Sequence, residues 1–184
     1  MHNEDIMGKR SEFDRIPRDF YPTPPAAVEP LLPHLQKWDV QRFCEPCAGD
    51  GQLVDTLEQA GLTCCHKSDI APGRIDIVEQ DALELDEMKI LEADAIITNP
   101  PWRRDLLHPM IEYFMALKPT WLLFDADWIH TKQARELISY CRLIVSVGRV
   151  KWIPDSKHTG KDNVCWYYFT KYMQTKETEF IGRQ

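Results

Sequence analysis

The sequence lacks several features that would place it in other classes of protein. No apolar run approaches the ~20 residues that a transmembrane helix needs. The N-terminus, with Glu4 and Asp5, has no basic segment leading into an apolar one, as a secretory signal peptide would. Positive charge is also scarce, because 22 Lys and Arg stand against 29 Asp and Glu, for a net charge of −7. We therefore expect a cytoplasmic protein that could bind nucleic acid through a local basic surface but not through its overall charge.

Internal repeats and low-complexity tracts are missing as well. At 184 residues, with 43% hydrophobic and 28% charged residues, the chain has the composition of one globular domain. Residues 1–18 are polar without a sustained period, so we expect a flexible N-terminal arm followed by a single domain over residues 19–184.

Six cysteines are expected to be free thiols in a reducing compartment. A zinc site from Cys44, Cys47 and the Cys64-Cys65-His66 run is an alternative. We predict no metal, because Cys47 lies in a glycine loop that has another use.

Predicted strands and helices alternate along the chain, which is typical of right-handed βαβ units. Residues 26–36 are predicted to form two short helical turns, each opened by a proline. The last two strands have no helix between them and can pair antiparallel. We therefore predict an α/β fold with a doubly wound, mixed, mostly parallel sheet. The predicted strands are 42–45, 62–67, 75–79, 93–98, 121–124, 143–147 and 165–170, and the longer helices are 52–60, 106–117 and 131–140.

Three groups of polar residues follow predicted strands, where ligands collect in open α/β sheets. The first is a loop with Gly49 and Gly51, which lets the backbone approach a ligand closely, while Glu45 before it favours a cationic ligand over a phosphate. The second is a pair of acids, Asp69 and Asp81, suited to ribose hydroxyls and to an amino group. Each of these features alone is also compatible with an ordinary turn or a helix-capping residue.

The third group, Asn99-Pro100-Pro101-Trp102, follows a buried strand and is the most specific. The Asn99 side-chain oxygen and a proline carbonyl form a pair of acceptors that can hold an exocyclic amino group. Trp102 offers a flat face on which a planar base can stack. His108 is not expected to be catalytic, and the other aromatic residues of the later strands are expected in the core.

At these residues the sequence resembles class I S-adenosylmethionine-dependent methyltransferases, and among them the enzymes that form N6-methyladenine in DNA. The resemblance covers residues 19–171, with its motifs in the γ order. Residues 148–163 are similar to the small adenine methyltransferases of phages and prophages. The motifs that carry the resemblance are Phe20-Tyr21-Pro22-Thr23-Pro24, Glu45-Pro46-Cys47-Ala48-Gly49-Asp50-Gly51, Asp69, Asp81 and Asn99-Pro100-Pro101-Trp102.

The resemblance implies a Rossmann-like methyltransferase fold, S-adenosylmethionine as cofactor and DNA as partner. It implies that Thr23 and the glycine backbone hold the methionine part, with Glu45 near its ammonium group. It further implies that Asn99 and the Pro100 carbonyl bind the target amino group, Trp102 stacks on the base, and the methyl group passes directly to N6 of a flipped adenine. The implied cofactor contacts are Tyr21, Thr23, Glu45, Pro46, Cys47, Ala48, Gly49, Gly51, Asp69, Ile70, Asp81, Ala82 and Asn99, and the implied catalytic residues are Asn99, Pro100, Pro101 and Trp102.

The sequence departs from large DNA methyltransferases, because the chain has no room for a separate target-recognition domain. Phosphate contacts are expected instead from a few local basic residues, Arg103, Arg104, Lys151, Lys157, His158 and Lys161. Three alternatives stay open: an RNA adenine-N6 methyltransferase, a protein-glutamine methyltransferase, and a non-catalytic subunit that keeps the fold. Oligomeric state, target sequence and strand preference do not follow from the sequence.

Overall fold

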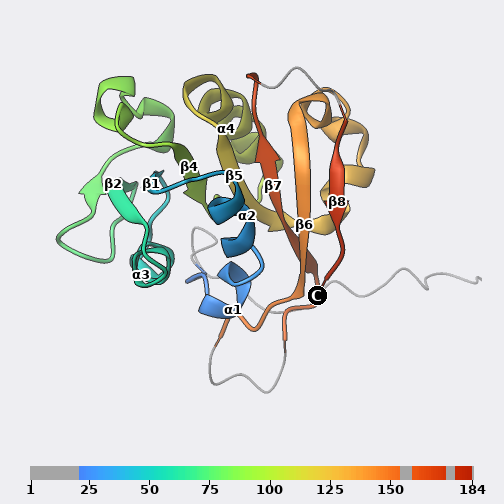
Figure 1. The fold of residues 1–184 in the computed structure, drawn as a ribbon, viewed down its shortest axis with the longest axis horizontal. Coiled ribbons are helices and arrows are strands. Elements are labelled where there is room, and N and C mark those ends of the chain that lie inside the picture. Colours follow the sequence, from blue (N-terminus) through green and yellow to red (C-terminus); the bar gives the residue numbers. More distant parts are fainter. Residues whose placement is uncertain (1–20, 154–158, 173–176, 184) are drawn as a thin grey trace, which may run out of the picture.

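The computed structural model describes residues 21–153, 159–172 and 177–183. In these residues, eight strands form one sheet in the order β3-β2-β1-β4-β5-β7-β6-β8 (Figure 1). The predicted doubly wound, mixed sheet is confirmed: β7 runs antiparallel to its neighbours β5 and β6, and the other pairs are parallel. The strands are β1 Arg42–Glu45, β2 Thr63–Asp69, β3 Val78–Glu79, β4 Ala95–Thr98, β5 Thr120–Asp125, β6 Cys141–Arg149, β7 Asn163–Phe169 and β8 Glu179–Ile181.

Helices cover both faces of this sheet. Figure 1 shows α1, α2 and α3 in front of it. The two short turns predicted for residues 26–36 are α1 and α2, each with a proline in its first turn. The described part of the chain contains no helix that is long and apolar enough to cross a membrane. The α-helices are α1 Pro25–Val28, α2 Leu32–Lys37, α3 Gln52–Gln59 and α4 Arg104–Leu117; 3₁₀ turns span Ala82–Glu84, Glu87–Ile90, Ala126–His130, Lys132–Ala134 and Leu137–Tyr140.

Alternate side chains of the central strands enter two separate cores, as the two-residue period of a strand requires. In β5, Trp121 and Leu123 pack toward α1, α2 and α3, whereas Leu122 and Phe124 pack toward α4 and the 3₁₀ turns. The same alternation runs through β7, where the aromatic residues predicted to be core residues are buried. With both faces covered, the strands can be almost wholly apolar.

The structure differs from the prediction in four places. The helix predicted over residues 131–140 is a series of 3₁₀ turns, and its buried residues Ala134 and Leu137 are three apart, the spacing that a 3₁₀ helix places on one side. The strand predicted at 75–79 is only Val78–Glu79, because the preceding residues form an ion-paired loop. Strand β8 was not predicted at all, and Ala60 is exposed beyond the end of α3 instead of lying on its buried side.

The N-terminal arm predicted for residues 1–18 lies outside the described residues.

Candidate cofactor and target-base site

The carboxyl ends of three neighbouring parallel strands bring the sequence motifs together. Strand β1 ends at Glu45, β2 ends at Asp69, and β4 ends at Thr98, directly before Asn99. Strand β1 lies between β2 and β4, so these ends share one edge of the sheet, the lower one in Figure 1. The strand order reverses at β1 and β4, which is where open α/β sheets form their ligand crevice.

The loop between β1 and α3 turns sharply at two glycines. Gly49 and Gly51 have φ angles of 55° and 83°, in the left-handed region that favours glycine. The Gly51 N–H donates to the Ala48 carbonyl at 2.7 Å, and the Ala48 N–H donates to the Ser68 carbonyl at 2.9 Å. These bonds close the loop and tie it to β2, so its backbone forms a compact turn that a ligand can approach closely.

The Asp69 carboxylate organises the same loop. Its Oδ2 accepts a hydrogen bond from the Gly49 N–H at 2.8 Å, and its Oδ1 accepts one from the Ala71 N–H at 2.8 Å. An ionised carboxylate can accept about four hydrogen bonds, so two of these sites are left for hydroxyl groups of a ligand. Asp69 is half-buried at the crevice, which is consistent with the role predicted for it.

Glu45 is a fully buried carboxyl group in an acidic environment. It is 1% exposed, and its Oε2 has no hydrogen-bond partner. Burial, together with the charges of Asp69, Asp50 and Asp55, raises its pKa well above the usual value, while a hydrogen bond from the Val54 backbone N–H acts in the other direction. Burying a carboxyl group with one oxygen unpartnered is costly, so the site favours an incoming cation. S-adenosylmethionine carries an ammonium and a sulfonium group. The buried Glu45 and the acids around it therefore fit this cofactor.

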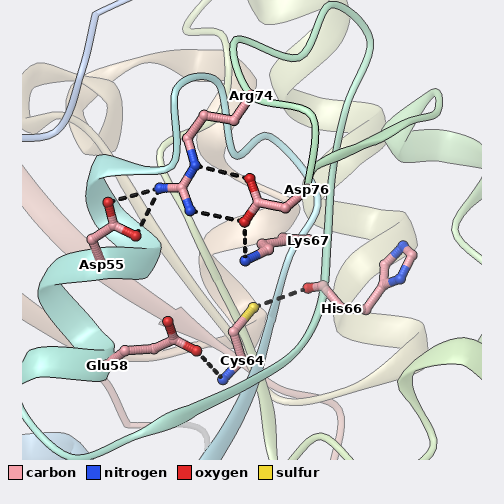
Figure 2. Close-up of polar contacts among 7 residues, drawn as sticks. All are labelled: Asp55, Glu58, Cys64, His66, Lys67, Arg74 and Asp76. Atoms are coloured by element: carbon pink, nitrogen blue, oxygen red, sulfur yellow. Dashed lines mark hydrogen bonds and ion pairs between the residues drawn. The ribbon is translucent and has the colours of Figure 1, made fainter.

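A network of ion pairs holds the loop between β2 and β3 against α3 (Figure 2). The Arg74 Nη1 donates to both carboxylate oxygens of Asp55 at 2.7 Å, and its Nε and Nη2 donate to Asp76 at 3.0 and 2.8 Å. Lys67 of β2 pairs with the same Asp76 at 2.7 Å. A Cβ atom at Gly51 would lie 2.5 Å from Nη1 of Arg74. The absence of a side chain at Gly51 thus leaves the space that the guanidinium occupies.

Other residues predicted to contact the cofactor differ in exposure and in hydrogen bonding. Ile70 is 63% exposed next to Asp69, so its side chain is accessible to a ligand. Asp81 is exposed and caps a 3₁₀ turn, because its Oδ1 accepts a hydrogen bond from the Leu83 N–H at 2.9 Å. Ala82 and Pro46 are buried.

The Asn99 side chain is fixed by hydrogen bonds at both ends. Its Nδ2 donates to the Thr23 hydroxyl at 3.1 Å, and its Oδ1 accepts from the Trp102 indole N–H at 3.1 Å. The same indole N–H also approaches the Leu123 carbonyl at 3.2 Å. Thr23 is buried just before α1, and α1 is anchored to the sheet because the Trp166 indole N–H donates to the Ala27 carbonyl at 2.7 Å. Two motifs far apart in the sequence thus meet at this amide.

Three aromatic rings lie beside Asn99. The Trp102 and Trp152 ring centroids are 5.7 Å apart in an edge-to-face arrangement, and Tyr21 and Trp152 are 6.3 Å apart. A Cβ atom at Gly160 would lie 3.1 Å from Cδ1 of Trp152, so the backbone there packs against the indole. The sequence reasoning missed Trp152 as a site residue. Its signal was weak, because it lies in a loop with no strand or motif to place it.

The predicted phosphate-binding residues differ in whether they form ion pairs with acids of the chain. Arg103 forms an ion pair with Asp105 at 2.5 Å, and Arg104 forms one with Asp125 at 2.6 Å. Lys151 and Lys161 are exposed at the ends of β6 and β7. Lys157 and His158 lie outside the described residues.

The surroundings of Cys47 and His108 indicate structural roles. Burial raises the pKa of the Cys47 thiol, as expected for a thiol that packs inside the glycine loop. The His108 Nε2 accepts a hydrogen bond from the Trp128 indole N–H at 3.0 Å. Among the described residues, no group of three His, Cys, Asp or Glu side chains could hold a metal ion.

Comparison with known proteins identifies the fold. No protein-family profile matches the sequence, and no curated protein matches it significantly. Solved structures do match. A proposed RNA methyltransferase of Pyrococcus horikoshii is 18% identical with a TM-score of 0.61, over 90% of this chain and 94% of that one. A proposed class I S-adenosylmethionine-dependent methyltransferase of Listeria monocytogenes is 13% identical with a TM-score of 0.60, over 94% of this chain and 68% of that one.

The M protein of the type I restriction enzyme EcoKI is also similar, with 14% identity and a TM-score of 0.51, over 80% of this chain and 43% of that one. At these identities the likeness establishes the fold alone. The chain therefore has the Rossmann-like fold of class I methyltransferases, as the sequence predicted.

Proposed function

We propose that this chain is an S-adenosylmethionine-dependent methyltransferase that modifies the exocyclic N6 amino group of adenine in DNA. The observation that carries the proposal is the Asn99 amide, held between Thr23 and Trp102 at the end of buried β4, beside the glycine loop and its acids. A fold alone does not specify an activity, so the argument rests on this site.

The half of the edge formed by β1, β2 and β3 suits a cationic cofactor. Glu45 would lie near the methionine ammonium, Asp69 would accept from the ribose hydroxyls, and Ile70 would cover the adenine ring. Asp81 would accept from the adenine amino group with the lone pairs that its capping bond leaves. When bound, S-adenosylmethionine supplies an electrophilic methyl group on a sulfonium centre.

The half beside β4 suits the target amino group. The Asn99 Oδ1 accepts one hydrogen bond from Trp102 and keeps its second lone pair for a target N–H. The Pro100 carbonyl provides the second acceptor, so two N–H bonds are held while the nitrogen lone pair is left to react. Because the Thr23 and Trp102 bonds set the amide orientation before a base arrives, catalysis here depends on positioning and on stabilising a developing positive charge.

The aromatic residues suit a base that has left the helix. Trp102 can stack on the target, and Trp152 meets it edge to face. An adenine inside a duplex cannot reach Asn99, so duplex DNA requires base flipping. RNA is the second candidate substrate, and the likeness to the proposed RNA methyltransferase over nearly its whole length favours it over a protein substrate.

The test is transfer of label from methyl-labelled S-adenosylmethionine to DNA or to RNA, with the products digested to nucleosides. We expect N6-methyladenine from DNA, lost in Asn99→Ala. The matched control is Gln36→Ala, an exposed amide on α2 that should keep full activity. Label in RNA alone would move the substrate to the second candidate.

Cofactor binding in calorimetry separates the remaining outcomes. Cofactor binding without label in either nucleic acid would favour a protein substrate or a non-catalytic subunit. Absence of both cofactor binding and label would refute the proposal.

A further inference from the structure

The topology places basic residues from the last strands at the same edge as Asn99. Strands β5 and β6 both run antiparallel to β7, and β8 runs parallel to β6. The carboxyl ends of β6 and β8 therefore lie at the edge where β4 and β5 end. Arg149 is the last residue of β6, and Arg183 follows the end of β8 by two residues. Figure 1 shows β8 running beside β6 toward this lower edge.

Arg183 lies directly over the end of β6. Gly148 has a φ angle of 84°, and a Cβ atom there would lie 3.1 Å from both Cδ and Nη1 of Arg183. The guanidinium thus occupies the space that a side chain at position 148 would fill. Through its pairing with β6, β8 brings Arg183 to the end of β6 that carries Arg149, 34 residues earlier in the sequence.

These residues have little compensating negative charge. Within the described segments 149–153, 159–163 and 181–183 there are four cations, Arg149, Lys151, Lys161 and Arg183, and one acid, Asp162. Among the described residues, none of the four forms an ion pair with a carboxylate, in contrast to Arg103 and Arg104. Clustered like charges repel one another, so such a cluster is costly unless it serves an anion. In a chain of net charge −7 it goes against the overall sign.

The cluster continues toward the proposed base pocket. Lys151 precedes Trp152, and the Trp152 ring contacts Trp102 at 5.7 Å. Only Val150 and Lys151 separate Arg149 from Trp152 in the sequence. An anion bound at Arg149 and Arg183 would therefore lie near the base site. Guanidinium groups bind phosphates through paired N–H donors, and phosphates of a strand on either side of a flipped base repeat at short intervals.

We propose that the ends of β6, β7 and β8 form the surface that binds the phosphate backbone of the nucleic-acid substrate, with Arg149 and Arg183 as its outer members. This inference rests on the proposed function. It assigns binding of the phosphate backbone to the catalytic domain itself, through Arg183 after β8. Arg103 and Arg104, which already pair with acids, would contribute less to this binding.

The experiment compares Arg149→Ala/Arg183→Ala with Lys37→Ala/Arg135→Ala. The control pair removes the same charge from exposed residues of α2 and of the 3₁₀ region, for which the structure gives no ion pair. Binding of fluorescent adenine-containing duplex DNA, single-stranded DNA and RNA is followed by anisotropy at several salt concentrations. The slope of log K against log salt is negative, and each lost phosphate contact reduces its magnitude by about 0.9 for a duplex and about 0.7 for a single strand.

We expect the magnitude of the slope to be smaller in the test variant by about 1.8 for a duplex, or by about 1.4 for a single strand. The control should keep the wild-type slope. Cofactor binding should be equal in both variants. A slope change with DNA, with RNA or with both supports the inference, since the phosphodiester is shared, and shows which polymer is bound. Slopes and affinities equal to those of the control would overturn it.

Failure of the proposed function is recognised separately. If the test variant loses slope relative to the control while the wild type transfers no methyl group, the surface stands and the activity falls. If the wild type transfers methyl groups but the test variant binds like the control, only this inference falls. If the wild type binds no nucleic acid, the surface is refuted.

Discussion

Replacing Gly51 with alanine should destabilise the protein by a predictable amount, because two separate costs meet there. The φ angle of 83° puts a β-carbon in a conformation that costs about 1–2 kcal/mol for an L-residue. The new atom would also lie 2.5 Å from Nη1 of Arg74, which must move away from Asp55. That ion pair is partly exposed, so its loss costs about 0–1 kcal/mol. We expect a total of about 1–3 kcal/mol from these two costs.

Gly61 provides the control, since it has a φ angle of 97° but no atom within 4 Å of the point where an added β-carbon would lie. Gly61→Ala should therefore carry the backbone cost alone. At about 2–4 °C per kcal/mol for a chain of this size, Gly51→Ala should unfold up to about 4 °C below Gly61→Ala. Urea unfolding measures the free energies, and calorimetry should show weaker cofactor binding in Gly51→Ala only.

A double-mutant cycle isolates the collision. Introduced into Arg74→Ala, Gly51→Ala should cost about the same as Gly61→Ala, because the guanidinium is no longer there. An extra cost of Gly51→Ala over Gly61→Ala that stays equally large in the Arg74→Ala background would refute the reasoning.

Two further predictions concern the buried polar groups of the site. In Glu45→Gln, the free energy of unfolding should exceed that of the wild type increasingly as the pH rises from 5 to 8, because the raised pKa of Glu45 makes the folded wild type retain a proton that the unfolded chain releases. Urea unfolding at both pH values tests this, with weaker cofactor binding by the variant expected at pH 8; a constant difference would contradict it. Trp102→Phe should lower the methylation rate about fivefold, because it keeps a flat ring but loses the N–H that orients Asn99, a bond of about 1 kcal/mol. Trp128→Phe, which also loses an indole N–H bond, should lower stability but leave the rate unchanged, and equal rates in both variants would count against the role of Trp102.

Local pattern was enough to predict most of the sheet and which motifs lie at its carboxyl ends. Apolar runs such as residues 95–98 and 121–124 indicated buried strands, because strands covered on both faces need apolar side chains throughout. Gly49 and Gly51 indicated a sharp turn, since the required φ angles are positive. The parallel direction of the strands then implied that Glu45, Asp69 and Asn99 would share an edge, which the structure confirms.

The failed predictions fall where short segments depend on their surroundings. The segment 131–140 has the composition of a helix, but burial of Ala134 and Leu137 holds it in 3₁₀ turns. The three residues of β8 are too few to carry a recognisable pattern, and they form a strand only because β6 offers them an open edge.

Tertiary structure alone decided the partners of the polar side chains. The sequence by itself determined that Asn99 ends a buried strand, but only packing of α1 against β7 places Thr23 beside its amide. The sequence contains Arg149 and Arg183 as two unrelated cations, and only the pairing of β8 with β6 brings Arg183 over Gly148 at the end of the strand that carries Arg149. The physical reason is that strand and turn propensities act over a few neighbouring residues, whereas these contacts join residues that only the completed sheet brings within reach.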